Sequence, residues 1–145
     1  MKVVLTSEFC YGHRLQNYNG KCSRLHGHNA KLEVTLESVT AEGYDAFDEN
    51  GFVIDFTVAK NIIKGVTDDF DHYCILENTD PLVKALSDLK EDFKIVNYPP
   101  TAEYIVRTLM DRIDSALRNE PVSGLIDVVR VVLWETANNC AVVEA

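Results

Sequence analysis

The chain lacks long apolar runs and the marks of a secreted protein. None of its apolar runs reaches the roughly 18 residues of a membrane span, and its start, "MKVVLTSEF", does not resemble a signal peptide. Its four cysteines lie far apart, which favours free thiols over a disulfide framework. At 145 residues and 46% hydrophobic, the chain can bury a core without such staples. We expect one cytoplasmic domain over residues 1–145, with no membrane partner.

Positive charge is also scarce. The chain has 14 Lys and Arg against 23 Asp and Glu, a net charge of −9 that repels nucleic acid and anionic lipid. The acids, however, are absent from residues 9–32, where Arg14, Lys21, Arg24 and Lys31 fall. This basic island is either a chance cluster on a solvated loop or a site for an anionic ligand such as a phosphate. Nucleic acid is therefore not an expected partner, whereas a small anion is.

The hydrophobic pattern predicts strands, then helices, then strands. In the second strand, Ala30, Leu32, Val34 and Leu36 alternate with polar residues, which is typical of a strand with one buried face. Candidate caps precede two of the helices. The expected strands cover 2–14 (interrupted or bulged), 28–37, 124–136 and 139–145, and the expected helices cover 56–71, 81–92 and 102–118. This order predicts an α+β fold, an antiparallel sheet with helices packed on one face.

Three of the four histidines fall where the first two strands should run side by side. Because side chains alternate along a strand, His26 and His28 point to one face about 7 Å apart, and His13 from the neighbouring strand completes a triangle. Three imidazoles facing one point suit zinc and leave a fourth position for water or substrate. The spacing predicts a catalytic metal centre, although it does not distinguish zinc from iron, nickel or copper.

Cys22, four residues before His26, has three interpretations. As a fourth ligand it would close the metal shell and make the site structural. Just outside the shell, the positive charges of Lys21, Arg24 and a metal favour its thiolate, which can act as a general base. The third interpretation, a buried inert cysteine, fits poorly with so polar a neighbourhood. The residues alone leave these alternatives open.

Five short motifs carry a resemblance to a known family. They resemble, in order, motifs of the 6-pyruvoyl-tetrahydropterin synthase family and of its queuosine-pathway branch, 6-carboxytetrahydropterin synthase. The motifs are "GHRL", "CSRLHGH", "FDHY", "PPTAE" and "WETANN", and they run from residue 12 to residue 139. The resemblance implies the tunnelling fold (T-fold), in which each subunit gives a four-stranded antiparallel sheet and two helices. Subunits then join their sheets into a β-barrel, and two trimers make a homohexamer.

The resemblance also implies a role for each motif residue. His13, His26 and His28 would hold Zn²⁺, and Cys22 would abstract a proton. Asp71 and His72, from the same or a neighbouring subunit, would relay a proton. Glu135 would anchor a pterin ring, with Thr101 and Glu103 close by. One carboxylate can accept the ring N–H and the amino group of a pterin together. Plainer interpretations are a solvated strand-end acid for Glu135, helix-end polar residues for Asp71 and His72, and helix-dipole compensation for Glu103.

The implied substrate is 7,8-dihydroneopterin triphosphate, whose triphosphate would leave toward Lys21 and Arg24. In the queuosine branch, side-chain cleavage releases acetaldehyde and leaves a 6-carboxy group, whereas in the pyruvoyl branch the carbons stay attached. The three residues between Cys22 and His26 resemble the queuosine type. We therefore expect a 6-carboxytetrahydropterin synthase of 7-deazaguanine (preQ0/queuosine) biosynthesis. The alternatives are a 6-pyruvoyl-tetrahydropterin synthase and a non-catalytic zinc- or pterin-binding module.

Overall fold

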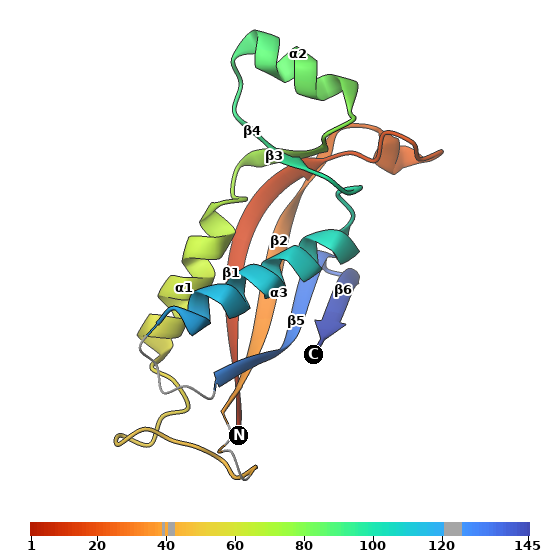
Figure 1. Cartoon of the computed structure of the whole chain (residues 1–145). Coiled ribbons are helices and arrows are strands. Elements are labelled where there is room, and N and C mark those ends of the chain that lie inside the picture. The colour runs from red at the N-terminus through yellow and green to blue at the C-terminus, as the bar shows by residue number, and fades with distance from the viewer. Residues whose placement is uncertain (39, 41–42, 121–125) are drawn as a thin grey trace.

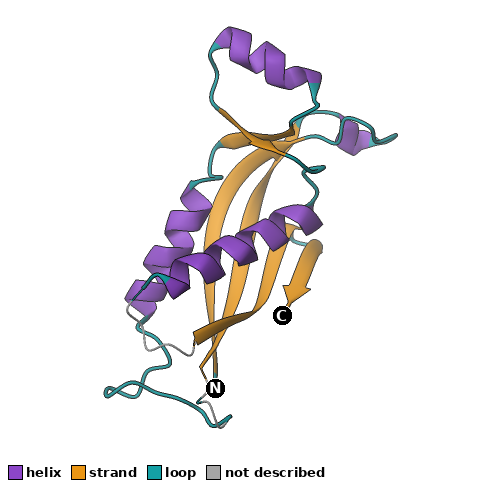
Figure 2. Cartoon of the chain, viewed as in Figure 1, coloured by secondary structure: helices purple, strands orange, loops and turns teal. Residues whose placement is uncertain are grey.

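A computed structural model describes residues 1–38, 40, 43–120 and 126–145. Its secondary structure is mixed, with strands at both ends of the chain and helices between them (Figure 2). The elements are β1 (Lys2–His13), a short 3-10 turn η1 (Lys21–Ser23), β2 (His26–Ser38), α1 (Phe56–Asp68), β3 (Tyr73–Glu77), α2 (Pro81–Leu89), β4 (Phe93–Val96), α3 (Ala102–Arg118), β5 (Ile126–Thr136) and β6 (Asn139–Glu144). The α+β class is therefore confirmed.

The sheet has six strands, in the order β4-β3-β1-β2-β5-β6. Four of them, β1, β2, β5 and β6, form the expected antiparallel meander. The prediction of a purely antiparallel, four-stranded sheet is wrong at one edge, where β3 pairs parallel with the end of β1 and β4 pairs parallel with β3. These strands have only five and four residues, too few to show an alternating pattern.

The first strand is continuous, so the predicted interruption or bulge in it is wrong. β1 and β2 pair without a shift from Lys2 opposite Glu37 to His13 opposite His26. The irregularity lies instead between Thr35 and Leu36 of β2, where the register with β5 shifts. Residues 124 and 125, the start of the predicted strand 124–136, lie outside the described residues. Along this unbroken β1–β2 pairing, buried core residues are followed by the histidines at the end where His13 pairs with His26.

The core lies between the sheet and the two longer helices. Figure 1 shows α1 and α3 lying across the same face of the sheet, with α1 against β1 and α3 against β5 and β6. The alternating apolar residues of β2 are all buried, and they share one hydrophobic core with five residues of α3, namely Ile105, Val106, Leu109, Ile113 and Leu117. Each large aliphatic side chain buried in this way contributes about 1.5–3 kcal/mol. His26 and His28 continue the same alternation along β2, so they lie on the face of the strand that carries these buried residues.

Helix ends agree with the predicted caps. Asp55 accepts a hydrogen bond from the Thr57 backbone N–H at 2.6 Å, and Thr101 caps α3. α1 ends at Asp68 rather than near residue 71, because the chain turns there to enter β3.

α2 has no fully buried residue and extends from the end of the sheet that lies opposite the N-terminus (Figure 1). Among the described residues, no helix combines the length and apolar character needed to cross a membrane.

Candidate metal centre and active site

The three histidines meet where β1 and β2 end. His13 lies directly opposite His26 in the ladder, and His28 lies opposite Tyr11. One ring nitrogen from each histidine lies within 4.8 Å of the others, and the Nε2 atoms of His13 and His28 are 3.1 Å apart. The three ring centroids are 4.6–5.1 Å from one another. The structure thus brings the three sequence-predicted ligands to one point.

Backbone carbonyls orient two of these rings. His13 Nδ1 lies 2.6 Å from the Pro100 carbonyl, and His26 Nδ1 lies 2.8 Å from the Arg24 carbonyl. A carbonyl only accepts, so Nδ1 carries the proton and Nε2 is left with its lone pair. Burial lowers the pKa of His13 below its usual value, against the opposing effect of the Pro100 carbonyl, and so favours the neutral form that binds metals. This donor set fits a zinc ion.

A pocket of about 460 Å³ opens beside the cluster. Its lining comes from the loop after β1, the start of α3 and the β5–β6 hairpin. It includes the three histidines together with Cys22, Thr101, Glu103 and Glu135. The structure therefore gathers seven of the predicted site residues around one cavity, from segments that lie more than a hundred residues apart.

Cys22 lies at this pocket but outside the metal cluster. The group of potential ligands whose donor atoms lie within 4.8 Å of one another consists of His13, His26 and His28, and Cys22 is not part of it. It is exposed on η1, between Lys21 and Arg24, which are exposed as well. Neither basic side chain lines the pocket. Cys22 thus lies outside the three-histidine cluster, and its thiol is exposed.

Glu135 faces the histidines from β5. Its Oε1 atom lies 3.7 Å from His13 Nε2 and 3.8 Å from His28 Nε2. The same oxygen accepts a hydrogen bond of 2.6 Å from the hydroxyl of Tyr11. Burial, reinforced by the hydrogen bond and charge of Glu135, raises the pKa of Tyr11 far above its usual value. Sequence analysis did not identify Tyr11, although its place two residues before His13 on a strand puts it on the same face.

Asp71 and His72 are fixed to β1 through the backbone of Cys10. Asp71 Oδ1 accepts from the Cys10 N–H at 2.8 Å, and the His72 N–H donates to the Cys10 carbonyl at 2.6 Å. The other Asp71 oxygen, Oδ2, lies 2.9 Å from His72 Nδ1. The Cys10 N–H and, to a lesser degree, His72 lower the pKa of Asp71, against the effect of its partial burial. His72 has a φ of 64°, a conformation that histidine adopts more readily than most residues.

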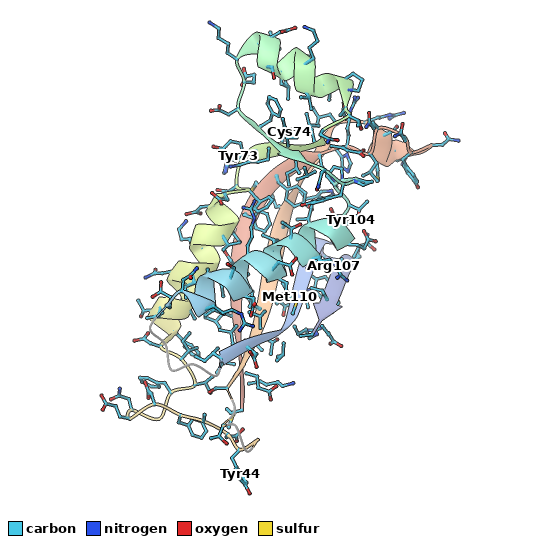
Figure 3. All side chains as sticks on the ribbon, viewed as in Figure 1. Tyr44, Tyr73, Cys74, Tyr104, Arg107 and Met110 are labelled. Carbon is cyan, nitrogen blue, oxygen red and sulfur yellow. The ribbon has the colours of Figure 1, made fainter. Side chains whose placement is uncertain are left out.

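Asp71 and His72 do not line the pocket that contains Cys22 and Glu135. The side chain of His72 is 80% exposed and lines a second pocket, of about 400 Å³, whose lining also includes Cys10, Cys74, His26 and His28. Figure 3 labels Cys74 at the end of the sheet where β1 meets β3, and Cys74 pairs with Gly12 there. Asp71 and His72 therefore form an Asp–His pair that projects outward.

A family model described as 6-pyruvoyl tetrahydropterin synthase matches residues 2–145. The chain belongs to that family. Among curated relatives, it is 38% identical over 160 residues to a 6-carboxy-5,6,7,8-tetrahydropterin synthase from Aquifex aeolicus, with 97% of this chain and 95% of that protein covered. It is 34% identical over 141 residues to a protein of the same name from Rickettsia bellii, covering 95% and 96% of the two chains.

Solved structures agree on the fold. An uncharacterised protein from Wolinella succinogenes superposes with a TM-score of 0.78 at 23% identity, covering 99% of this chain and 97% of that one. The 6-pyruvoyl tetrahydropterin synthase of Caenorhabditis elegans superposes with a TM-score of 0.67 at 21% identity, covering 100% and 95%. The tunnelling fold expected from the family motifs is thereby confirmed for the subunit.

Proposed function

We propose that this protein is a zinc-dependent 6-carboxy-5,6,7,8-tetrahydropterin synthase. It would be a lyase that converts 7,8-dihydroneopterin triphosphate to 6-carboxytetrahydropterin, acetaldehyde and triphosphate, in 7-deazaguanine (preQ0/queuosine) biosynthesis. The observation that carries the proposal is the single pocket lined by Cys22, Glu135 and three convergent histidines. The names of the curated relatives support the same product.

In this proposal, His13, His26 and His28 hold the zinc ion through Nε2. When bound, zinc supplies a Lewis acid that polarises the side-chain hydroxyls of the substrate. The carbonyls of Pro100 and Arg24 fix two of the rings beforehand, so little rearrangement is needed to bind the ion.

Cys22 takes the carbon-bound proton of the substrate as a thiolate. It is exposed at the pocket and lies next to Lys21, with Arg24 two residues further on. Both basic side chains can bind the triphosphate as it leaves. The basic island of the sequence would thus serve the anionic part of the substrate.

Glu135 anchors the pterin ring. A carboxylate has about four lone-pair directions, so it can accept the ring N–H and the amino group while it still accepts from Tyr11. Thr101 and Glu103, from the start of α3, line the same pocket. These contacts orient the ring so that its side chain reaches the histidines and Cys22.

The Asp71–His72 pair acts on the pocket of a neighbouring subunit. Asp71 holds the Nδ1 side of His72, which leaves Nε2 to give and accept a proton. His72 is exposed and does not line the pocket that contains Cys22 and Glu135, so in this proposal a second copy brings the imidazole to that pocket. We propose a homohexamer with its active sites at subunit interfaces.

The test incubates the purified, zinc-loaded protein with 7,8-dihydroneopterin triphosphate and measures the products by mass spectrometry. The expected products are acetaldehyde and 6-carboxytetrahydropterin. Detection of only the pyruvoyl product would support the other branch of the family. A bound but unchanged ligand would support a non-catalytic binding module.

Cys22→Ala tests the proposed base. The variant is expected to retain its zinc and to lose turnover by about 10²–10⁴-fold, the usual contribution of a general base. Cys74→Ala is the control for the loss of a thiol, because Cys74 does not line the pocket that contains Cys22; it should retain its zinc. Loss of zinc in Cys22→Ala would make Cys22 a ligand and contradict its role as the base.

A further inference from the structure

Tyr11 is a buried residue whose hydroxyl is aimed at the pocket carboxylate. Only 3% of its surface is exposed, and its O–H donates to Glu135 Oε1 at 2.6 Å, across the intervening strand β2. Its ring stacks on Phe9, with centroids 5.6 Å apart, and meets His13 edge-on at 5.3 Å. The phenol is therefore held firmly on two sides, and its hydroxyl has a fixed direction.

The same carboxylate oxygen lies close to the proposed metal position. Glu135 Oε1 is 3.7 Å from His13 Nε2 and 3.8 Å from His28 Nε2. Donor atoms that share one tetrahedral zinc lie about 3.3–3.5 Å apart, given zinc bond lengths of about 2.0–2.2 Å. A shift of a few tenths of an ångström would therefore make Glu135 a ligand. It would then occupy the position that the substrate needs.

We propose that Tyr11 is a positioning residue that restrains Glu135 from binding the metal and keeps its carboxylate turned toward the pterin. This inference rests on the proposed metal and pterin roles of the site. A hydrogen bond to a charged group is stronger than one between neutral groups, and it can bias a carboxylate between two nearby partners. The bond occupies one lone pair of Oε1, and among the described residues no hydrogen bond occupies Oε2. The free oxygen remains available to the ligand.

Tyr11→Phe tests the proposal, because it removes the hydroxyl and leaves the packed ring. Without the bond, Glu135 should join the metal ligands, so zinc affinity should rise about tenfold, while affinity for neopterin should fall about tenfold. Isothermal titration measures both. The visible spectrum of the Co²⁺-substituted protein, which depends on the number and kind of ligands, should also change. In the double variant Tyr11→Phe, Glu135→Gln, the gain in zinc affinity should disappear.

Tyr98→Phe is the matched control. Tyr98 is partly buried, and its hydroxyl forms a hydrogen bond of 2.7 Å with the Thr108 hydroxyl. Neither residue lines the metal pocket. This variant should bind zinc and neopterin as the wild type does. A zinc affinity of Tyr11→Phe that is unchanged or lowered would overturn the proposal, since a hydroxyl with a merely structural role would give that result.

Wild-type turnover, measured separately, distinguishes this inference from the proposed reaction. A wild-type protein that binds zinc and neopterin but does not convert the triphosphate would refute the reaction, and the Tyr11→Phe titrations would still decide the role of Tyr11. A wild-type protein that binds no zinc would overturn both.

Discussion

Asp80→Asn should destabilise the far end of the sheet. Asp80 is 3% exposed and begins α2, where its Oδ1 accepts from the Leu82 N–H at 2.8 Å. Its two oxygens also accept from the guanidinium of Arg14, through Nε at 2.7 Å and through Nη2. Arg14 follows His13 directly, so this pair ties the β3–α2 connection to the end of β1 beside the metal cluster.

The size of the effect follows from what the amide can and cannot replace. Asparagine caps a helix about as well as aspartate, so the cap is retained. The two-point pairing is lost, because an amide has only one accepting oxygen. Removing one partner of a buried ion pair costs about 3–5 kcal/mol, but the Arg14 side chain is 23% exposed and can partly rehydrate. We expect a loss of about 2–3 kcal/mol in the free energy of unfolding.

Urea denaturation followed by circular dichroism measures this loss, at one protein concentration because assembly adds to apparent stability. The matched control is Asp88→Asn, which removes an exposed pair with Lys84 on the same helix and should cost less than about 0.5 kcal/mol. A loss in Asp80→Asn no larger than that of the control would refute the reasoning.

The same pair predicts a pH dependence. Chiefly because Arg14 donates to it, the pKa of Asp80 is lowered, against the effect of burial. The folded-state pKa thus lies below the unfolded value of about 3.9, and the stabilisation is present above that pH and lost as the pH falls through the folded value. The difference in stability between wild type and Asp80→Asn should shrink as the pH falls below about 4. An unchanged difference would contradict this assignment.

Two further predictions concern the metal and the core. Dialysis against a chelator should remove the metal and leave the far-ultraviolet circular dichroism unchanged, because the buried apolar cluster does not depend on the ion; unfolding on chelation would instead indicate a structural metal. Leu109→Ala, at a fully buried position of α3, should lower the free energy of unfolding measured in urea by about 2–5 kcal/mol. The control Leu89→Ala, at a position of α2 that is 70% exposed, should lower it by less than about 0.5 kcal/mol. Equal losses would contradict the assigned core.

The parts of the fold that sequence predicted well are those with a long periodic pattern. β2 alternates over its whole length, and α3 has both a capping threonine and a regular apolar face. β3 and β4 escaped prediction because they are short and because their pairing depends on distant contacts. The Asp71 carboxylate and the His72 backbone bind Cys10, some sixty residues earlier, and this guides β3 onto β1.

The same contrast holds for the candidate site. The convergence of His13, His26 and His28 follows from alternation on two adjacent strands, so the sequence could predict it. The bond between Tyr11 and Glu135 joins residues 124 apart through a third strand, and no local spacing reveals it. The outward position of His72 likewise depends on a backbone conformation that only the structure shows.

The unbroken pairing of β1 with β2 links the metal centre to the correctness of folding. A slip of one residue would turn Leu32 and Val34 of β2 toward solvent, and it would also move His26 and His28 to the face opposite His13. A misaligned hairpin could therefore neither bury its core nor chelate an ion. The free energy of metal binding would then add to that of core burial, and both would favour the same strand register.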